Sequence, residues 1–413
     1  MLRAAARHHD GWPLRQSLGQ LYARMGDLHE AVEQFERALG HTAGDARSLN
    51  GLGAALGELG RFREAAAAFE RATEHDPAQV EGLVNLGVLA ATNGQPERAL
   101  ACLRAAIDRA PEHAGAQANL GRVLGRQGAY AEAIAALDRA HALSPDDPML
   151  AIDAAMVRIA ARAEDQAHAF LDRALRRHPG HSGLLAARAL ALGGQGHDAR
   201  VRRLHGLHRF VHSRLLDLDP AALLPVLLDD PTLTMAPRSH ATRGGLHSGA
   251  IDHRRRPAVA PLRDAIAQAV HEYRLALLAS DHPFVRAAPG QLGLQMWSVV
   301  LREGGHQVPH IHPQAWLSGV FYAEVPTQCR DHDPDAGGLC FGEIDPEIRH
   351  RARFERRVIR PEPGLLVLFP SYLWHRTIDF SGPGRRVSVA FDVMGTHVFS
   401  TSHPRPRASP PGR

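Results

Sequence analysis

The stretch SLNGLGAALGELGRFREAAAAFERATEHDP, residues 48–77, predicts two helices joined by a short turn. Apolar residues recur at helical spacing up to Gly60, a residue type that often ends a helix. The run that starts at Arg63 has the same periodicity and stops before Pro77, which cannot continue a helix. The stretch therefore indicates a helical hairpin.

The same unit recurs along the first half of the chain at a constant step of 34 residues. Several coincident series at one period indicate a repeat architecture. We expect the small residues to lie where two helices approach closely, and the large apolar residue to fill the space between them. The series are Gly19, Gly53, Gly87 and Gly121; Gly26, Gly60, Gly94 and Gly128; Ala31, Ala65, Ala99 and Ala133; Ala38, Ala72, Ala106 and Ala140; and Phe35, Phe69, Leu103 and Leu137.

The period and the residue types resemble those of the tetratricopeptide repeat family. Four units are clear between about residues 12 and 145, a fifth has Ala155 and Arg162 in place of both glycines, and a half-unit follows around 180–200. We therefore expect an α-solenoid over residues 1–200. Such arrays usually present a concave surface to a peptide or a protein, so we expect a partner of that kind. The alternative is an array that only dimerises or stiffens the chain.

The pattern changes after residue 200. Residues 201–290 are expected to form a connecting region with packing helices, and 257–279 predict one amphipathic helix that packs on the outside of a following sheet. From residue 291, short alternating runs punctuated by glycine and proline predict an antiparallel sandwich or barrel. The final residues, 398–413, predict a disordered tail. The predicted strands are QLGLQMWSVVL (291–301), SGVFYAEV (318–325), GGLCFGEI (337–344), GLLVLFP (364–370) and RRVSVAFDV (385–393).

Three histidines and an arginine lie at or near the ends of these predicted strands. His310 and His312 lie two residues apart, so an extended chain would direct both to one face. His375 follows an apolar strand, and Arg386 begins the next strand with Ser388 on its own face. In a double-stranded β-helix, or jelly roll, this arrangement assembles a mononuclear iron site. Fe(II) held by three protein groups keeps three positions open for a 2-oxo acid and O2, and arginine suits the far carboxylate of that acid.

The segments PHIHPQAWLSGVFY (309–322), PGLLVLFPSYLWH (363–375) and RRVSVAFD (385–392) resemble the 2-oxoglutarate/Fe(II) oxygenase superfamily. More narrowly, the chain resembles bacterial oxygenases of the prolyl-hydroxylase-like kind that follow tetratricopeptide repeats. The resemblance implies a jelly roll over residues 291–397. It also implies Fe(II) as cofactor, 2-oxoglutarate and O2 as co-substrates, and hydroxylation of a protein, peptide or small molecule.

The resemblance also assigns roles to residues beside the metal. Arg386 and Ser388 match the pattern that holds the co-substrate carboxylate in this superfamily, and Tyr322 falls where related hydroxylases place a tyrosine on the same carboxylate. Arg385 is the alternative to Arg386, although its side chain would point to the opposite face. Trp297 could line the cavity, as could Trp316, although aromatic residues on strands are more often core.

The chain departs from the superfamily at one ligand. The usual motif is H-x-D or H-x-E, whereas His312 stands here at the acidic position. We predict His310, His312 and His375 as the metal ligands, since neutral imidazoles bind Fe(II) well. Two alternatives stay open. His312 could be the first ligand, or an acidic group such as Glu343 or Asp345 could enter from the next strand.

Two other functions compete with an oxygenase. The missing acidic ligand favours a scaffold protein whose jelly roll has lost catalysis, although such a domain has no need for a carboxylate clamp. Three histidines also suit a cupin-like metalloenzyme that does not use 2-oxoglutarate, although Arg386 would then lack a purpose.

Composition excludes several other classes. The formal net charge of +4 is too small to indicate nucleic acid. The three cysteines, Cys102, Cys329 and Cys340, form neither a disulfide framework nor a CxxC pair. The N-terminus lacks the apolar core of a signal peptide, and no run approaches the roughly 18 apolar residues of a membrane span. We therefore expect a cytoplasmic protein without a membrane or nucleic-acid partner.

Overall fold

The computed structural model describes residues 11–236, 240–254, 256–326 and 334–395. The predicted tail at 398–413 and Cys329 lie outside the described residues. The chain divides into two compact units, one up to Val157 and the other from Arg158 onwards. The domain limits expected near residues 200 and 290 mark changes in sequence pattern and stay predictions.

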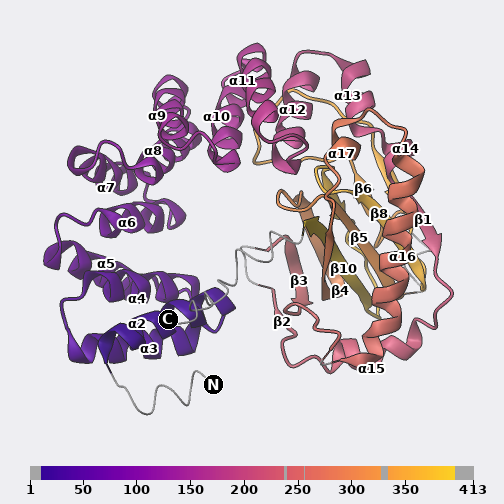
Figure 1. The fold of residues 1–413 in the computed structure, drawn as a ribbon, viewed down its shortest axis with the longest axis horizontal. Helices are drawn as coiled ribbons and strands as arrows, with labels where there is room; N and C mark the ends of the chain where they lie inside the picture. Colours follow the sequence, from indigo (N-terminus) through magenta and orange to yellow (C-terminus); the bar gives the residue numbers. More distant parts are fainter. Residues whose placement is uncertain (1–10, 237–239, 255, 327–333, 396–413) are drawn as a thin grey trace, which may run out of the picture. The chain divides into compact units, whose positions relative to one another are not determined.

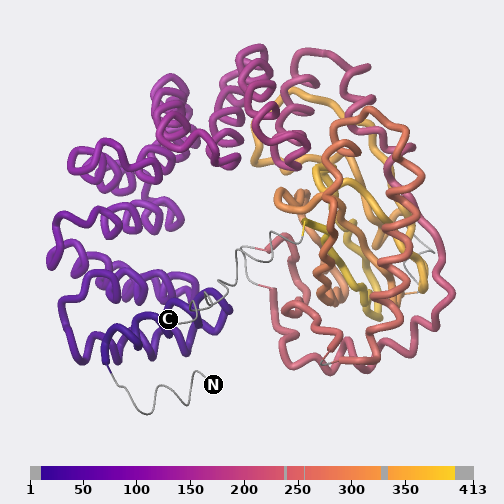
Figure 2. Tube along the Cα trace, in the orientation of Figure 1, coloured from indigo at the N-terminus to yellow at the C-terminus, as the bar shows by residue number. Residues whose placement is uncertain are grey.

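The first unit is a succession of helix pairs, each joined by a tight turn (Figures 1 and 2). This is the predicted α-solenoid of tetratricopeptide repeats. Helix α10 (Pro148–Ala160) crosses the border between the units. The pairs are α2 (Trp12–Met25) with α3 (Leu28–His41), α4 (Ala46–Glu58) with α5 (Phe62–His75), α6 (Glu81–Thr92) with α7 (Pro96–Arg109), and α8 (Ala114–Arg126) with α9 (Tyr130–Leu143).

The small residues of the repeat lie where the helices of a pair touch, as predicted. A Cβ atom added at Gly53 would lie 2.5 Å from Cε1 of Phe69, which is too close for any side chain. The same relation joins Gly121 to Leu137, whose Cγ would lie 2.6 Å from such an atom. Gly60 ends the first helix of its pair with φ at 78°, a conformation that favours glycine. Sequence and packing therefore agree within each repeat.

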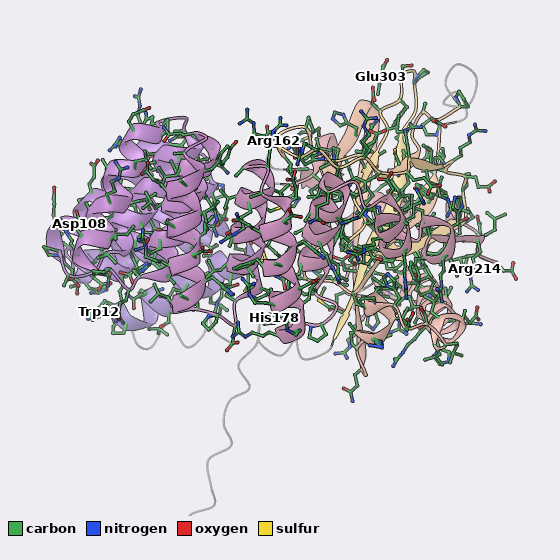
Figure 3. The ribbon with its side chains drawn as sticks, turned by 90° about the horizontal axis from the view of Figure 1, so that it is seen from above. Trp12, Asp108, Arg162, His178, Arg214 and Glu303 are labelled. Atoms are coloured by element: carbon green, nitrogen blue, oxygen red, sulfur yellow. The ribbon has the colours of Figure 1, made fainter. Side chains whose placement is uncertain are left out.

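The repeat continues into the second unit with α11 (Glu164–Arg177), α12 (Ser182–Gly194) and α13 (Asp198–His205). The half-unit expected around 180–200 is thus a complete helix pair, which turns at Gly196 with φ at 77°. Arg162, labelled in Figure 3, occupies the position where the earlier repeats have glycine. Among the residues that the structure describes, it alone has a positive φ (61°) without being glycine. The turn therefore keeps its geometry at a conformational cost of about 1–2 kcal/mol.

The second unit is built around an antiparallel sheet with strand order β1-β8-β5-β10-β4-β9-β6-β7, to which β3 and β2 add beside β4. The long β4 pairs with β10 through its first half and with β9 near its end. This curled arrangement agrees with the predicted jelly roll. The strands are β1 (His212–Leu215), β2 (Thr234–Met235), β3 (Thr242–His247), β4 (Leu292–His310), β5 (Leu317–Glu324), β6 (Leu339–Phe341), β7 (Arg357–Ile359), β8 (Leu365–Pro370), β9 (His375–Thr377) and β10 (Arg386–Gly395).

Helix α16 (Ala260–Leu277) runs along the outside of this sheet (Figure 1). Its buried face, which includes Leu262, Ile266 and Tyr273, joins the same apolar core as the strands. The helix predicted over 257–279 therefore packs on the sheet as expected, with a 3₁₀ turn (η2, Pro257–Val259) at its start. No helix within the described ranges is long and apolar enough to cross a membrane.

The last repeat helices are bonded to the sheet part of the second unit. The Ser182 hydroxyl on α12 donates to the Ala315 carbonyl at 2.6 Å, three residues beyond His312. On α11, the buried carboxylate of Glu164 accepts two hydrogen bonds from Arg351, at 2.9 and 2.7 Å. The first contact fixes the turn between β4 and β5, which carries His312, and the second fixes the segment between β6 and β7.

Candidate metal centre

Three histidines converge at one end of the sheet. His310 ends β4 and lies directly opposite His375, the first residue of β9. His312 follows in the turn before β5. One nitrogen from each ring lies within 4.8 Å of the others, a spacing that allows all three to hold one metal ion. The ring centroids are 4.3 Å apart for His310 and His375, and 5.2 Å apart for the other two pairs.

Hydrogen bonds fix which nitrogen of each ring is available. Nδ1 of His310 bonds to the Val308 carbonyl at 2.8 Å, and Nδ1 of His375 bonds to the Leu373 carbonyl at 2.9 Å. Because a carbonyl oxygen can only accept, each Nδ1 must carry the proton. Each Nε2 then keeps its lone pair, which is the state that a metal ligand needs.

Burial keeps these imidazoles neutral. Burial, and then the neighbouring His312, lower the pKa of His310 to about 3. The pKa of His375 is held well below its usual value, first by burial and then by His310 and His312. The aromatic rings of Phe341 and Phe369 lie beside His375, with centroids 6.2 and 4.6 Å from its own. At neutral pH both rings are therefore ready to bind a cation without first losing a proton.

The acidic alternatives from the sequence have other partners. Glu343 pairs with Arg356 at 2.8 Å and with Arg376 at 2.5 Å. Burial alone would raise the pKa of Glu343, but hydrogen bonds from these two arginines outweigh it and hold the pKa at about 2. Asp345 accepts from the backbone N–H of Glu347 at 2.9 Å. In the described part of the chain, the cluster suited to a metal consists of the three histidines without either carboxylate.

A buried cation that has no acidic partner among the described residues lies on β10. Arg386 is 1% exposed, and its Nε and Nη1 have no hydrogen-bond partner among the described residues. Its guanidinium lies over the ring of Tyr322, 4.7 Å from the centroid, and the Tyr322 hydroxyl has no well-aligned hydrogen bond within the described residues, its neighbour being Arg386 itself. Burial raises the pKa of that hydroxyl, so it stays protonated. Since a buried charge is costly unless it is paired, this corner suits an anionic ligand with several acceptor oxygens.

The neighbouring candidates differ from Arg386. Ser388 is buried on the same face of β10, and its hydroxyl has only a long bond of 3.4 Å to the Val299 carbonyl. Arg385 points the other way, is 42% exposed and pairs with Glu324 at 2.8 Å. Of the two arginines, Arg386 is therefore the one that is buried and has N–H donors without a partner in the described structure.

The two tryptophans lie in different places. The Trp297 ring stacks on His312 with centroids 5.9 Å apart, beside the histidine cluster. Trp316 stacks on Phe284 at 5.0 Å and donates from its indole to the Phe284 carbonyl. Trp316 therefore packs in the core beneath α16, and the prediction that it could line the cavity is wrong. Trp297 does border the histidines.

Asp392 was missed by the sequence reasoning. Its Oδ2 lies 2.9 Å from Nδ1 of His312, and its Oδ1 accepts from the Ser318 hydroxyl at 2.6 Å. The signal in the sequence was weak: Asp392 lies an even number of residues from Arg386 and Ser388, hence on the same face of the strand. Strand register brings it opposite Ser318, which the sequence does not reveal.

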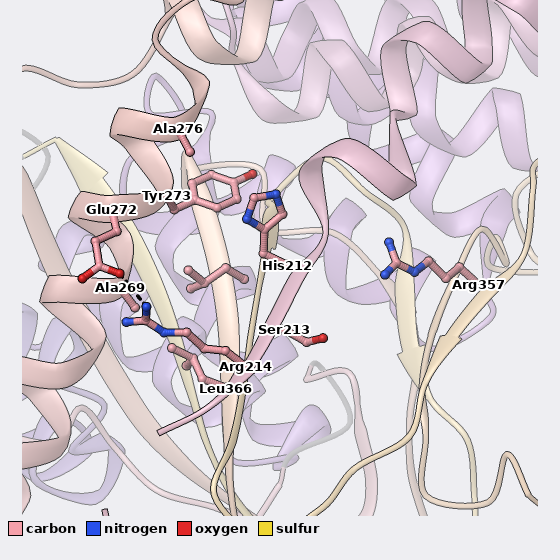
Figure 4. Close-up of a pocket in the computed structure, with 10 residues that line it drawn as sticks. His212, Ser213, Arg214, Ala269, Glu272, Tyr273, Ala276, Arg357 and Leu366 are labelled. Atoms are coloured by element: carbon pink, nitrogen blue, oxygen red, sulfur yellow. Dashed lines mark hydrogen bonds and ion pairs between the residues drawn. The ribbon is translucent and has the colours of Figure 1, made fainter. Parts of the chain in front are cut away.

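A separate cavity of about 490 Å³ opens between β1 and α16 (Figure 4). Its charged side chains are already paired. Arg214 bonds to Glu272 at 2.5 Å, and Arg357 donates to the carbonyl of Val211. The hydroxyl of Tyr273 donates to the Phe210 carbonyl at 2.8 Å. Because these groups are satisfied within the chain, we assign no chemistry to this cavity.

Family models match both parts of the chain. The model described as "Putative 2OG-Fe(II) oxygenase" matches residues 295–392, which include the three histidines, Tyr322, Arg386 and Ser388. Three tetratricopeptide repeat models match residues 14–78, 84–148 and 124–191. A comparison with curated proteins gives no significant match.

Solved structures similar to this chain include several tetratricopeptide repeat proteins. YrrB, described as having an unusual peptide-binding site, is 20% identical over 46% of this chain and 98% of its own, with a TM-score of 0.35. TTC0263 from Thermus thermophilus is 27% identical over 44% of this chain and 99% of its own, with a TM-score of 0.39. PilW, a type IV pilus biogenesis factor, is 20% identical over 48% of this chain and 92% of its own, with a TM-score of 0.44.

Proposed function

We propose that this chain, which joins tetratricopeptide repeats to a domain of the 2OG-Fe(II) oxygenase family, is a 2-oxoglutarate-dependent hydroxylase of a protein, peptide or small molecule. The observation that supports this most strongly is the buried Arg386 on β10, which has two donor nitrogens without a partner among the described residues, in the same domain as three convergent histidines. A buried cation without an acidic partner in the described structure suits a dicarboxylic co-substrate that reaches from the metal to the guanidinium.

In this proposal His310, His312 and His375 would hold Fe(II) through Nε2. The donor set fits the ion, because imidazole nitrogens bind Fe(II) well and three protein ligands would leave coordination positions for a co-substrate and O2. Bound Fe(II), with 2-oxoglutarate and O2, would supply the oxidation of a substrate C–H bond, giving succinate and CO2 besides the hydroxylated product. The Nδ1 bonds keep the three rings oriented before any ligand arrives, so binding needs little rearrangement.

Arg386, Ser388 and Tyr322 form the anchor for the distal carboxylate of 2-oxoglutarate. The guanidinium offers two donor nitrogens that have no partner among the described residues, and the Tyr322 hydroxyl adds a third donor beside it. Ser388 can turn its hydroxyl from its long bond toward the same carboxylate. Because the anchor is buried, each of these bonds is stronger than its equivalent in water.

The repeats would recruit a peptide or protein, either the substrate or a partner that brings it. Arrays of this kind commonly bind partners on the concave surface that the first helix of each pair lines. On such helices Val88 (α6) is 40% exposed and Met149 (α10) is 37% exposed, so apolar contact area is available. A cytoplasmic location stays a prediction from the sequence.

A three-histidine enzyme that does not use 2-oxoglutarate is the second candidate, because its donor set is the same. Anaerobic titration of the Fe(II)-loaded protein with 2-oxoglutarate separates the two. We expect a visible metal-to-ligand charge-transfer band that Arg386→Ala abolishes and Arg385→Ala retains. A protein that binds Fe(II) without developing the band, and forms no succinate in air, would favour the second candidate.

A further inference from the structure

The three histidines differ in the hydrogen-bond partner of Nδ1, the ring nitrogen that faces away from the predicted metal position. His310 and His375 each bond through Nδ1 to a carbonyl two residues earlier in their own chain segment. His312 lies beyond the end of β4, in a turn, and its Nδ1 bonds instead to the carboxylate of Asp392 on β10 at 2.9 Å. This is the one ring of the three that depends on a side chain from another strand.

The Asp392 carboxylate is fixed on both sides. Its Oδ1 accepts from the Ser318 hydroxyl at 2.6 Å, and the Ser318 hydroxyl lies 2.7 Å from that of Ser371. Ser318 is the direct cross-strand partner of Asp392, so the sheet register holds this chain of bonds. The backbone carbonyl of Ser371 also accepts from the His312 N–H at 3.0 Å. The carboxylate and the ring that it orients are thus tied to one framework.

No arginine or lysine side chain in the described part of the chain pairs with the Asp392 carboxylate. Its contacts within the described residues are Ser318 and the imidazole of His312, and its side chain is only 14% exposed. A carboxylate in such a place is stabilised best by a positive charge on the far side of that imidazole. The position beyond Nε2 of His312 is where the histidine cluster would hold its metal.

We infer that Asp392 is a positioning residue that acts through His312. It provides, one residue removed from the metal, the negative charge that an H-x-D or H-x-E motif places directly on it. The inference rests on the proposed function. Asp392 fixes the proton on Nδ1 of His312, sets the plane of the ring, and offsets part of the charge that three neutral ligands leave uncompensated. The acidic group that is absent from position 312 is therefore replaced by the Asp392 carboxylate, which contacts the ligand His312 instead of the metal.

Titration of the full-length protein with Co(II) tests this without requiring turnover. Its visible d–d bands report coordination, and their growth gives the dissociation constant. We expect Asp392→Asn to weaken Co(II) binding about 10–100-fold and to shift the bands. Asp379→Asn, the same change at an exposed position, should leave binding as in the wild type. Circular dichroism of each metal-free variant checks that it folds.

A double-mutant cycle tests whether Asp392 acts through His312. In a His312→Ala background, Asp392→Asn should produce no further loss of Co(II) affinity. An additional loss of the same size in that background would overturn the inference, as would wild-type affinity in Asp392→Asn. These results leave the proposed function intact. If the wild type itself fails to bind Co(II), the proposed function fails instead.

Discussion

Replacement of Arg386 by methionine should stabilise the ligand-free protein while removing its response to 2-oxoglutarate. Arg386 is 1% exposed and has two unpaired donor nitrogens within the described structure. Replacing even a paired buried charge by apolar side chains of similar volume is often neutral or stabilises a fold by about 1–4 kcal/mol, and a charge without a partner is costlier still to bury. The contact with the Tyr322 ring offsets about 0.5–2 kcal/mol of that gain. We therefore expect the free energy of unfolding to rise by up to about 3 kcal/mol.

Urea denaturation followed by tryptophan fluorescence reports mainly on the sheet unit, because three of the four tryptophans, Trp297, Trp316 and Trp374, lie there. Arg385→Met is the matched control. Its side chain is 42% exposed, so its pair with Glu324 should contribute less than about 1 kcal/mol.

The same assay with Mn(II) and 2-oxoglutarate measures ligand linkage. At a co-substrate concentration about 100 times the dissociation constant, the wild type and Arg385→Met should gain about 2.7 kcal/mol, and Arg386→Met should gain nothing. A ligand-free Arg386→Met protein that is less stable than the wild type would refute the reasoning, since the arginine would then have a structural role.

Three further predictions concern the scaffold. Arg162→Gly should raise the free energy of unfolding by about 1 kcal/mol in urea denaturation, because it relieves a positive φ; an unchanged or lower value would contradict the strain. Gly53→Ala should lower the melting temperature because its Cβ would meet Phe69 at 2.5 Å, whereas Gly57→Ala in the same helix has its nearest neighbour at 3.9 Å and should stabilise by about 0.5–1 kcal/mol; equal effects would contradict the packing. Burial lowers the pKa of His205 to about 4, below the unfolded value of about 6.5, so the native state binds fewer protons and stability is lost as pH falls from about 6.5 to about 4. Compared with His205→Leu, the wild type should lose up to about 3 kcal/mol more across that window in pH-dependent denaturation, and parallel pH profiles would contradict this origin.

The repeats were the most predictable part of the molecule, because their information is local. Each small residue meets its partner within the same hairpin, as Gly53 meets Phe69. The turn at Arg162 shows the limit: the residue type argues against a left-handed conformation, and only the packing of the neighbouring helices enforces it. The sequence likewise predicted only a half-unit around residues 180–200, whereas α12 and α13 form a complete helix pair, because packing and not the repeat pattern defines that pair.

The histidine cluster was partly predictable. The two-residue spacing of His310 and His312 placed them together, and the alternating pattern of β10 directed Arg386 inward. Asp392 could not be identified in this way, because its role depends on the register between β10 and β5 and on where the turn leaves His312. Whether Trp316 or Trp297 borders the site likewise depends on which face packs under α16, a tertiary property.

A crystal structure of the protein grown anaerobically with Mn(II) and 2-oxoglutarate tests the central claim most directly. The account predicts one metal ion bonded to Nε2 of His310, His312 and His375, with the distal carboxylate of 2-oxoglutarate on Arg386 and Tyr322. A metal ion bound elsewhere, or a co-substrate that leaves the guanidinium of Arg386 unpaired, would contradict it.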